Sequence, residues 1–497
     1  MAPDSINKVG GEISVNGRVY RLPKRPTVVV CIDGSEPGYI EETVKAGRAP
    51  WFARVLKEGT NLLADCVVPS FTNPNNLSIV TGRPPSIHGI SGNYFLDPDT
   101  GKEVMMNDPK FLRIETLFPS FQRAGCRIAV VTAKDKLRGL LGKDLELAAG
   151  KACSFSSEKS DKATLAENGI DKVNALVGMA LPDVYSAGLS EFVFAAGVKL
   201  MERDRPEIMY LSTTDYIQHK HAPGTPVAND FYAMMDGYMA KLDAMGCTIV
   251  LTADHGMNAK FGKDGQPDVI YLQDLFDGWV GKDKAKVILP ITDPYVVHHG
   301  ALGSYAVVYC ADPAPQIAKL KAMAGIEAVL TKDEAAGRFE LPPERLGDIV
   351  VVSTRHKVLG TSAARHDLSG LTEPLRSHGG ISEQKVPLLC NHKLVTADAA
   401  RRWRNFDAFD LALAARRGEL TDVRIRSALS LRRRHDRAAV DELLPQRRLH
   451  LQQPIPLHGP VRRPSRLLQQ RGAHHRHPPA GAQLPAGCPQ SPAPNLG

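Results

Sequence analysis

Short apolar runs alternate with helix-like stretches over the first half of this 497-residue chain. Four of the runs carry no polar face, which is typical of strands buried on both sides in a parallel sheet. These runs are residues 27–33, 126–133, 207–213 and 247–253. Helix-like stretches separate them at 49–59, 113–125 and 227–246. The alternation predicts an α/β fold with a mostly parallel central sheet flanked by helices and right-handed crossovers.

Two changes in composition and in the pattern of apolar residues divide the chain further. Residues 257–375 read as strand pairs around helices, so we predict a smaller α+β cap domain inserted into a core made of residues 1–256 and 376–415. Residues 416–497 hold 15 Arg, no Lys and five acidic residues, and they carry more than the whole net charge of +8. This Arg-, Pro- and His-rich tail lacks apolar periodicity, so we expect disorder from about residue 440 onward.

The tail has two interpretations. It could be a segment that binds nucleic acid or another anionic surface. The hypothesis we favour is a non-native reading frame, because GC-rich DNA read out of frame yields Arg, Pro, Ala, Gly and His. Sequencing the gene across codons 405–420 separates the two.

The apolar runs and the cysteines of the chain predict a protein that does not associate with a membrane. The chain has no run of about 20 apolar residues, which a transmembrane helix needs. Its first residues lack the apolar region of a secretory signal. Eight cysteines are scattered without a CxxC pair, which favours reduced thiols and a cytoplasmic location.

Metal-type side chains follow three of the predicted strands. Asp33 ends the first run, Asp215 and His219 follow the third, and Asp254 and His255 follow the fourth. Ligands of parallel α/β sheets bind beyond the carboxyl ends of the strands. Asp215 and His219 are four residues apart, so they share one face if the chain turns helical after Asp215.

Two further candidates lie in the segments SFTNPNN and SHGG, namely Thr72 and His378. With them the set holds three carboxylates, three imidazoles and one hydroxyl, which suits two divalent cations per chain. Zinc accepts these ligands, and Mn or Fe would accept them too. The hydroxyl of Thr72 could be both ligand and nucleophile. The alternative is that Thr72 caps a helix that starts near Pro74.

Substrate contacts are predicted from two segments. Lys134 and Lys136 follow the second apolar run, and both ammonium groups point to one side if the strand persists. Such a pair suits an anionic ligand such as a carboxylate, and a solvated loop around Asp135 is the alternative. Asn93 could donate a hydrogen bond to a phosphonyl oxygen, or it could be a turn residue after Gly92.

The motifs IDG, SFTNPNN, TTDYIQH, TADHGM and SHGG, in this order, resemble the alkaline phosphatase superfamily. The threonine indicates its nucleotide pyrophosphatase/phosphodiesterase-like branch. Within that branch, SFTNPNNLSIVTGRPPSIHGISGNYF together with TAKDKLR resembles the phosphonoacetate hydrolases. The resemblance covers about residues 25–413 and not the tail.

The resemblance implies a role for each candidate residue. One zinc would be held by Asp215, His219 and His378, and the other by Asp33, Thr72, Asp254 and His255. Thr72 would attack phosphorus, and Asn93 would bind the phosphonyl oxygens. His219 and His378 would also contact the substrate, whose carboxylate would lie between Lys134 and Lys136.

The implied reaction is the cleavage of the C–P bond of phosphonoacetate to acetate and phosphate through a phospho-threonine. The enzyme would bind a small-molecule phosphonate and no nucleic acid. Whether it forms a homodimer is left open.

One rival is a nucleotide pyrophosphatase or phosphodiesterase, in which Tyr94 and Phe95 would form an aromatic slot for a base. A phosphomutase of the superfamily typically uses serine where this chain has Thr72. The non-enzyme rival is an anion- or nucleic-acid-binding protein that acts through the basic tail.

Overall fold

The computed structural model describes residues 11–293, 300–394 apart from residues 367, 370 and 372, and 401–414. These residues all belong to one compact unit that spans residues 1–425. The predicted tail of residues 416–497 lies outside the described residues.

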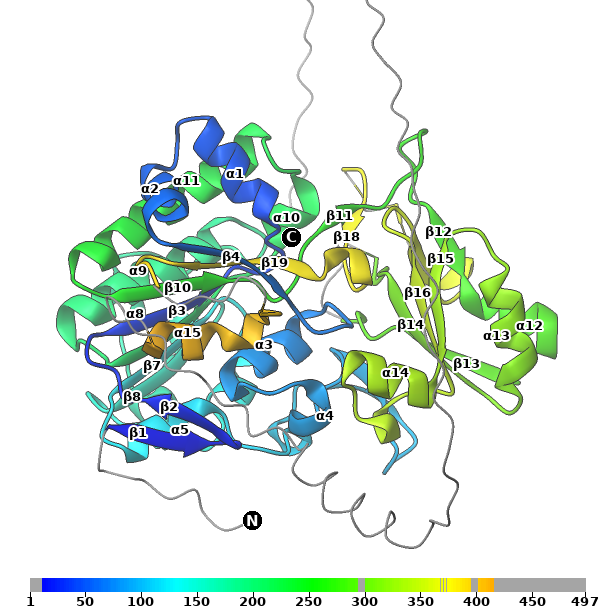
Figure 1. Cartoon of the computed structure of the whole chain (residues 1–497), viewed down its shortest axis with the longest axis horizontal. Helices are drawn as coiled ribbons and strands as arrows, with labels where there is room; N and C mark the ends of the chain where they lie inside the picture. The colour runs from blue at the N-terminus through cyan, green and yellow to red at the C-terminus, as the bar shows by residue number, and fades with distance from the viewer. Residues whose placement is uncertain are drawn as a thin grey trace, which may run out of the picture. The chain divides into compact units, whose positions relative to one another are not determined.

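A seven-stranded sheet with the order β4-β19-β10-β3-β9-β7-β8 forms the centre of the core (Figure 1). Its strands are β3 (Thr27–Cys31), β4 (Thr60–Asp65), β7 (Ile128–Thr132), β8 (Ala152–Ser156), β9 (Ile208–Ser212), β10 (Thr248–Thr252) and β19 (Lys385–Cys390). The five strands from β10 to β8 pair in parallel. β19 pairs antiparallel with β10 and β4, so the other six strands of this sheet share one direction. The predicted mostly parallel α/β sheet is confirmed.

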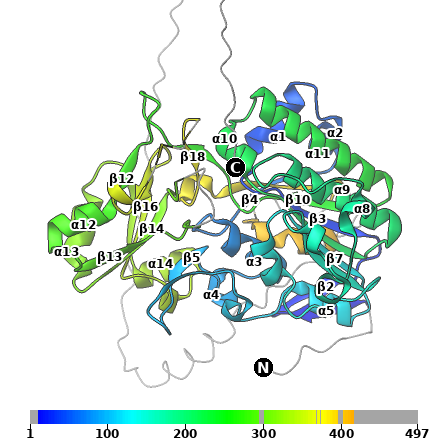
Figure 2. The ribbon, with the colours of Figure 1, turned by 180° about the vertical axis from the view of Figure 1, so that it is seen from behind.

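Alternating residues of the strands supply the cores on the two faces of this sheet. Val28 and Val30 of β3 belong to one apolar cluster, and Val29 and Cys31 belong to the other. The first cluster includes residues of α1 (Pro37–Lys45), α2 (Pro50–Glu58), α8 (Val173–Val177), α9 (Gly188–Arg203), α10 (Tyr216–Lys220) and α11 (Pro226–Ala244). The second includes residues of α3 (Thr72–Thr81), α5 (Leu117–Arg123), α6 (Asp135–Leu141) and α15 (Ala408–Ala414). Figures 1 and 2 show the two layers of helices on either side of the strands.

A second sheet lies within the predicted insertion. It has the order β13-β14-β16-β15, and every pair in it is antiparallel. Its strands are β13 (Ala285–Ile288), β14 (Tyr305–Cys310), β15 (Ile326–Thr331) and β16 (Ile349–Ser353), and its helices are α12 (Leu272–Val280), α13 (Pro313–Lys321) and α14 (Lys332–Phe339). β11 (Asn258–Ala259) pairs with β18 (Arg376–Ser377), so both ends of the segment lie side by side. The division into core and cap stays a prediction, because residues 1–425 form a single compact unit.

The remaining elements are short. They are β1 (Glu12–Val15), β2 (Arg18–Arg21), α4 (Pro85–His88), β5 (Tyr94–Leu96), β6 (Glu103–Met105), α7 (Leu165–Asn168), β12 (Val269–Tyr271) and β17 (Val358–Gly360). Within the described part of the chain, six 3-10 helices cover Pro109–Phe111, Ser160–Lys162, Pro343–Arg345, Ala363–Arg365, Ile381–Glu383 and Asn405–Asp407. Among the helices of the described residues, none combines the length and apolar character that crossing a bilayer requires. The seven cysteines in this part of the chain are free thiols.

Candidate metal centre and substrate cavity

The three aspartates predicted as ligands follow neighbouring parallel strands. Asp33 comes after β3, Asp215 after β9 and Asp254 after β10, and β3 lies between the other two strands. Because parallel strands end at the same edge of a sheet, the three carboxylates meet there. His255 follows Asp254 directly, and its Nε2 lies 3.2 Å from Asp33 Oδ1 and 3.9 Å from Asp254 Oδ2.

The other two imidazoles lie around Asp215. The predicted helical turn after this residue is present as α10, which places His219 Nε2 2.9 Å from Asp215 Oδ2. His378 follows β18, and its Nε2 lies 3.6 Å from the same oxygen. The ligand atoms therefore form two overlapping groups that suit a divalent metal. Among the described residues, one is Asp33, Asp254 and His255, and the other is Asp215, His255 and His378; the second group thus holds His255 where the resemblance implied His219.

Backbone carbonyl groups orient all three imidazoles in the same way. The Nδ1 atom lies 2.7 Å from Arg376 O in His219, 2.9 Å from Gly256 O in His255, and 2.8 Å from Ser70 O in His378. A protonated Nδ1 that donates to a carbonyl leaves Nε2 as the lone-pair donor. Each Nε2 faces the carboxylates, which is how metal-binding histidines are usually held.

The buried charges of this centre fit a cation. Burial raises the pKa of Asp33 well above its usual range, and the Asp215 and Asp254 carboxylates add to the rise. Burial opposes protonation of His255, yet Asp254 and Asp33 raise its pKa to about 10. Asp33 Oδ1 and His255 Nε2 are buried and, apart from their 3.2 Å approach to each other, have no hydrogen-bond partner among the described residues. A bound divalent cation would compensate these carboxylates and use both atoms, and oxygen and imidazole donors suit zinc.

Thr72 lines the same cavity as several of these candidate ligands. It is the first residue of α3, and Phe71 before it is the N-cap, without a side-chain hydrogen bond. The interpretation of Thr72 as the helix cap is therefore wrong. The Thr72 side chain is half-buried and lines one cavity with Asp33, Asp215 and His378.

Two buried asparagines of α3 hold this threonine in place. Asn75 Oδ1 accepts from Val67 N at 2.8 Å, and its amide donates to Phe71 O at 3.1 Å, which fixes the loop before Thr72. Asn76 Nδ2 donates to Thr72 O and to Asp254 Oδ2, both at 3.1 Å. The sequence analysis missed these roles. Adjacent asparagines in a helix that is buried along its length are the signal that could have revealed them.

The cavity at this edge of the sheet encloses about 640 Å³, including the part open to solvent. Lys134 and Lys136 both line it. The predicted geometry is wrong, because β7 ends at Thr132 and α6 begins at Asp135, so the strand does not persist through the two lysines. The helical turn nevertheless brings both lysines to the same cavity.

Each lysine has a neighbour that the sequence did not reveal. Lys134 Nζ lies 5.4 Å from the centre of the Tyr185 ring. Lys136 forms an ion pair with Asp293, a buried residue that also lines the cavity. Burial, and secondarily the charge of Lys134, lowers the pKa of Lys136 to about 8. Asp293 lies far from Lys136 in the chain, at the end of an apolar run like the aspartates predicted as ligands. That position is the feature of the sequence that could have identified it as a residue of the site.

Asn93 also lines the cavity. Its Oδ1 accepts from Asn73 N at 2.9 Å, which anchors the side chain beside the start of α3. The two aromatic residues that follow it do not line the cavity. Phe95 is buried against Phe111, with ring centres 5.1 Å apart, and the Tyr94 hydroxyl lies 3.5 Å from Glu103.

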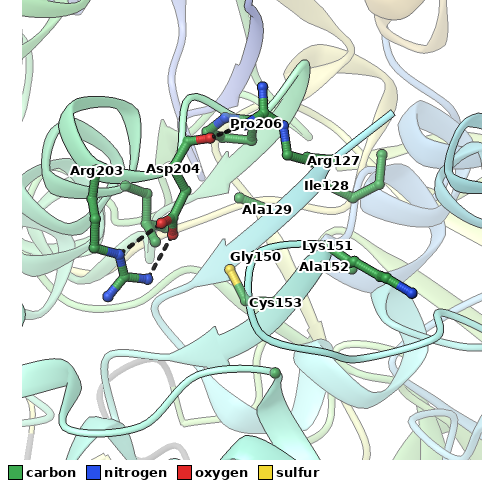
Figure 3. A pocket seen from close by; sticks show the side chains of 12 residues that line it. Arg127, Ile128, Ala129, Gly150, Lys151, Ala152, Cys153, Arg203, Asp204 and Pro206 are labelled. Carbon is green, nitrogen blue, oxygen red and sulfur yellow. Dashed lines mark hydrogen bonds and ion pairs between the residues drawn. The ribbon is translucent and has the colours of Figure 1, made fainter. Parts of the chain in front are cut away.

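A second, smaller hollow of about 290 Å³ lies at the opposite ends of β7 and β8 (Figure 3). Three of the four charged side chains that line it have partners: Arg203 pairs with Asp204, and Arg127 pairs with Glu207. This hollow lacks the imidazoles and the threonine that distinguish the first cavity, so we assign no chemistry to it.

Comparisons with known proteins relate this chain to a family and to solved structures. The family described as type I phosphodiesterase / nucleotide pyrophosphatase matches residues 27–380. Phosphonoacetate hydrolase from Sinorhizobium meliloti 1021, solved in complex with phosphonoacetate, is 59% identical with a TM-score of 0.79, and the match covers 81% of this chain and 98% of that one. Murine ectonucleotide pyrophosphatase / phosphodiesterase 5 is 17% identical with a TM-score of 0.53, and the match covers 78% of this chain and 94% of that one. This likeness shows the fold alone.

Two curated relatives match over shorter stretches. A pyrophosphatase/phosphodiesterase of Schizosaccharomyces pombe is 25% identical over 286 residues, which are 54% of this chain and 51% of the relative. Phosphonoacetate hydrolase of Penicillium oxalicum is 60% identical over 38 residues, which are 7% of this chain and 53% of that relative. The matches thus span about half the length of these curated relatives. The predicted resemblance is confirmed, and the chain belongs to the type I phosphodiesterase / nucleotide pyrophosphatase family of the alkaline phosphatase superfamily.

Proposed function

We propose that this protein is a zinc-dependent hydrolase that cleaves the C–P bond of phosphonoacetate to acetate and phosphate. The observation that carries the proposal is the composition of one cavity, which is lined by Thr72, by three of the candidate metal ligands, and by Lys134 and Lys136. The solved relative in complex with phosphonoacetate supports the choice of substrate.

The buried carboxylates and imidazoles would hold two divalent cations. In our assignment Asp215, His219 and His378 hold one, and Asp33, Thr72, Asp254 and His255 hold the other. Such ions supply Lewis-acid binding of phosphonate oxygens and lower the pKa of a coordinated hydroxyl. His255 belongs to both groups of potential donors, so its imidazole would be available to either cation.

The Thr72 hydroxyl gives its proton to water, its Oγ attacks phosphorus, and the C–P bond breaks with its electron pair going to the methylene carbon. The substrate carboxylate spreads this charge as an enediolate, and the carbon then takes a proton from water to give acetate. Lys134 and Lys136 bind the carboxylate most strongly when this charge develops. Their binding therefore stabilises the transition state more than the bound substrate and lowers the activation barrier. Asn93 donates its amide to a phosphonyl oxygen, and water then hydrolyses the phospho-threonine to phosphate and Thr72.

The test is phosphate release from phosphonoacetate by the purified, zinc-loaded full chain, with bis(p-nitrophenyl) phosphate measured alongside. We expect fast release from phosphonoacetate and slow cleavage of the diester. Diester cleavage alone would transfer the protein to the phosphodiesterases. A metal-replete protein inactive on both substrates would refute the hydrolase proposal.

A nucleotide phosphodiesterase is the second candidate, since the family as a whole carries that activity in its description. It needs an aromatic surface for a base. The described residues that line the cavity include no Phe, Tyr or Trp, and the proposed slot residues Tyr94 and Phe95 pack elsewhere. The non-enzyme alternative depends on the tail, which lies outside the described residues, and truncation after residue 415 should leave a hydrolase active.

The substitution Asp293→Asn is expected to lower KM for phosphonoacetate by about three- to tenfold, because removal of one nearby like charge favours an anionic ligand. The amide oxygen of the new side chain would still accept a hydrogen bond from Lys136, so the lysine keeps its orientation. Steady-state kinetics with p-nitrophenyl phosphate, which has no carboxylate, should show a smaller change. A higher KM for phosphonoacetate would instead make Asp293 a support for Lys136.

A further inference from the structure

Lys260 and Glu383 form a buried ion pair beside the candidate metal centre. Both side chains are 0% exposed, and Lys260 Nζ lies 2.9 Å from Glu383 Oε1. A buried pair is costly unless its remaining polar atoms are also satisfied. Glu383 Oε1 accepts from Asn258 Nδ2 at 2.6 Å and from Ser382 Oγ at 2.7 Å. Burial opposes its charge, but Lys260 and these hydrogen bonds outweigh burial and lower the pKa of Glu383.

Glu383 fastens the two loops that carry His255 and His378. Its Oε2 accepts from Gly380 N at 2.9 Å, two residues after His378. Its backbone oxygen accepts from Gly256 N at 2.8 Å, one residue after His255. A single residue thus connects the backbone of two candidate ligands that are far apart in the chain.

Lys260 reaches the same loop from its other side. Its Nζ donates to Ser304 Oγ at 2.7 Å and to Arg355 O at 2.6 Å. Ser304 N in turn donates to His378 O at 2.9 Å. The ion pair therefore holds the backbone at His378 directly through Glu383 and indirectly through Ser304.

The two imidazoles need this accuracy because they lie face to face. The rings of His255 and His378 are stacked with their centres 3.6 Å apart and an angle of 7° between their planes. Both belong to the same group of potential ligands together with Asp215. A small shift of either loop would change the distance between the two Nε2 atoms and with it the arrangement of donor atoms that they offer to a cation.

We propose that the Lys260–Glu383 ion pair positions His255 and His378 and thereby sets the metal affinity of the centre. Neither residue touches the proposed substrate cavity, so both are positioning residues. The inference rests on the proposed function only in taking these imidazoles as metal ligands. It does not depend on the substrate.

The test is the zinc affinity of Glu383→Gln in the full chain, measured at 25 °C by competition with a chromophoric chelator. We expect binding to weaken about 10- to 100-fold, as for other outer-shell partners of metal ligands. The matched control is Asp407→Asn, which breaks the buried Arg18–Asp407 pair, 9% and 5% exposed, at another place in the core. Both variants should lower the Tm of the metal-free protein, and only Glu383→Gln should weaken zinc binding.

Equal zinc affinity in Glu383→Gln and Asp407→Asn would overturn the inference and leave the pair a purely structural role. If Glu383→Gln does not fold, Lys260→Gln replaces it, because that change breaks the ion pair from the lysine side and leaves Glu383 its hydrogen bonds from Gly380 N and Asn258 Nδ2. It should weaken zinc binding in the same direction and alter the visible spectrum of the cobalt-loaded protein. An unchanged affinity and spectrum would refute the inference. A wild type that binds zinc but leaves phosphonoacetate intact would refute the proposed function alone.

Discussion

Replacing Thr72 by alanine is expected to reduce phosphonoacetate turnover at least about a thousandfold, because a missing nucleophile leaves only binding and electrostatic stabilisation. Thr72 opens α3 and lines the cavity beside Asp33, Asp215 and His378. Its hydroxyl is not needed as a helix cap, since the structure gives that position to Phe71. The measurement is single-turnover phosphate release with the metal content of each preparation determined.

Thr72→Ser is the matched variant, since it keeps the hydroxyl and should retain most of the activity. The melting temperature of both variants should stay close to that of the wild type, because the side chain is only half-buried. Turnover by metal-replete Thr72→Ala above about a tenth of the wild-type rate would mean that another group attacks phosphorus.

The convergence of Asp33, Asp215 and Asp254 was predictable because it follows from strand order and direction. Each ends an apolar run that is buried on both faces, and parallel strands bring such ends to one edge of the sheet. The pairing of Asp215 with His219 was predictable too, since a four-residue spacing needs only one helical turn. Local periodicity and one topological rule suffice for this part of the centre.

The contacts between distant segments were not predictable in this way. Lys260 and Glu383 are 123 residues apart, and no spacing in the sequence relates them. Asp293 meets Lys136 only because the segment after β13 returns to the cavity beside α6. The helix start at Asp135 was also missed, since the segment KDK after a strand fits a loop, a strand or a helix turn equally well.

Replacing Lys136 by alanine is expected to lower kcat/KM for phosphonoacetate about 100-fold, because a desolvated charge-assisted hydrogen bond to the leaving group is lost. The same change should alter kcat/KM for p-nitrophenyl phosphate less than about fivefold, since that ester has no carboxylate to bind. Lys134→Ala should show the same selectivity. Exposed Lys102 provides the control, and its alanine variant should leave both substrates unaffected.

The pH dependence tests whether the charge of Lys136 causes this selectivity. Burial and the neighbouring Lys134 lower the pKa of Lys136 to about 8, and the protonated form is the one that attracts a carboxylate. The KM for phosphonoacetate should therefore rise as the pH increases through about 8, whereas the KM for p-nitrophenyl phosphate should change less over the same range. In Lys136→Ala this difference between the substrates should shrink, because the titrating ammonium is gone. If the wild-type KM for phosphonoacetate stayed flat from about pH 7 to about pH 9.5, the carboxylate would have to be held by a group that does not titrate there, and the proposed role of Lys136 would be wrong.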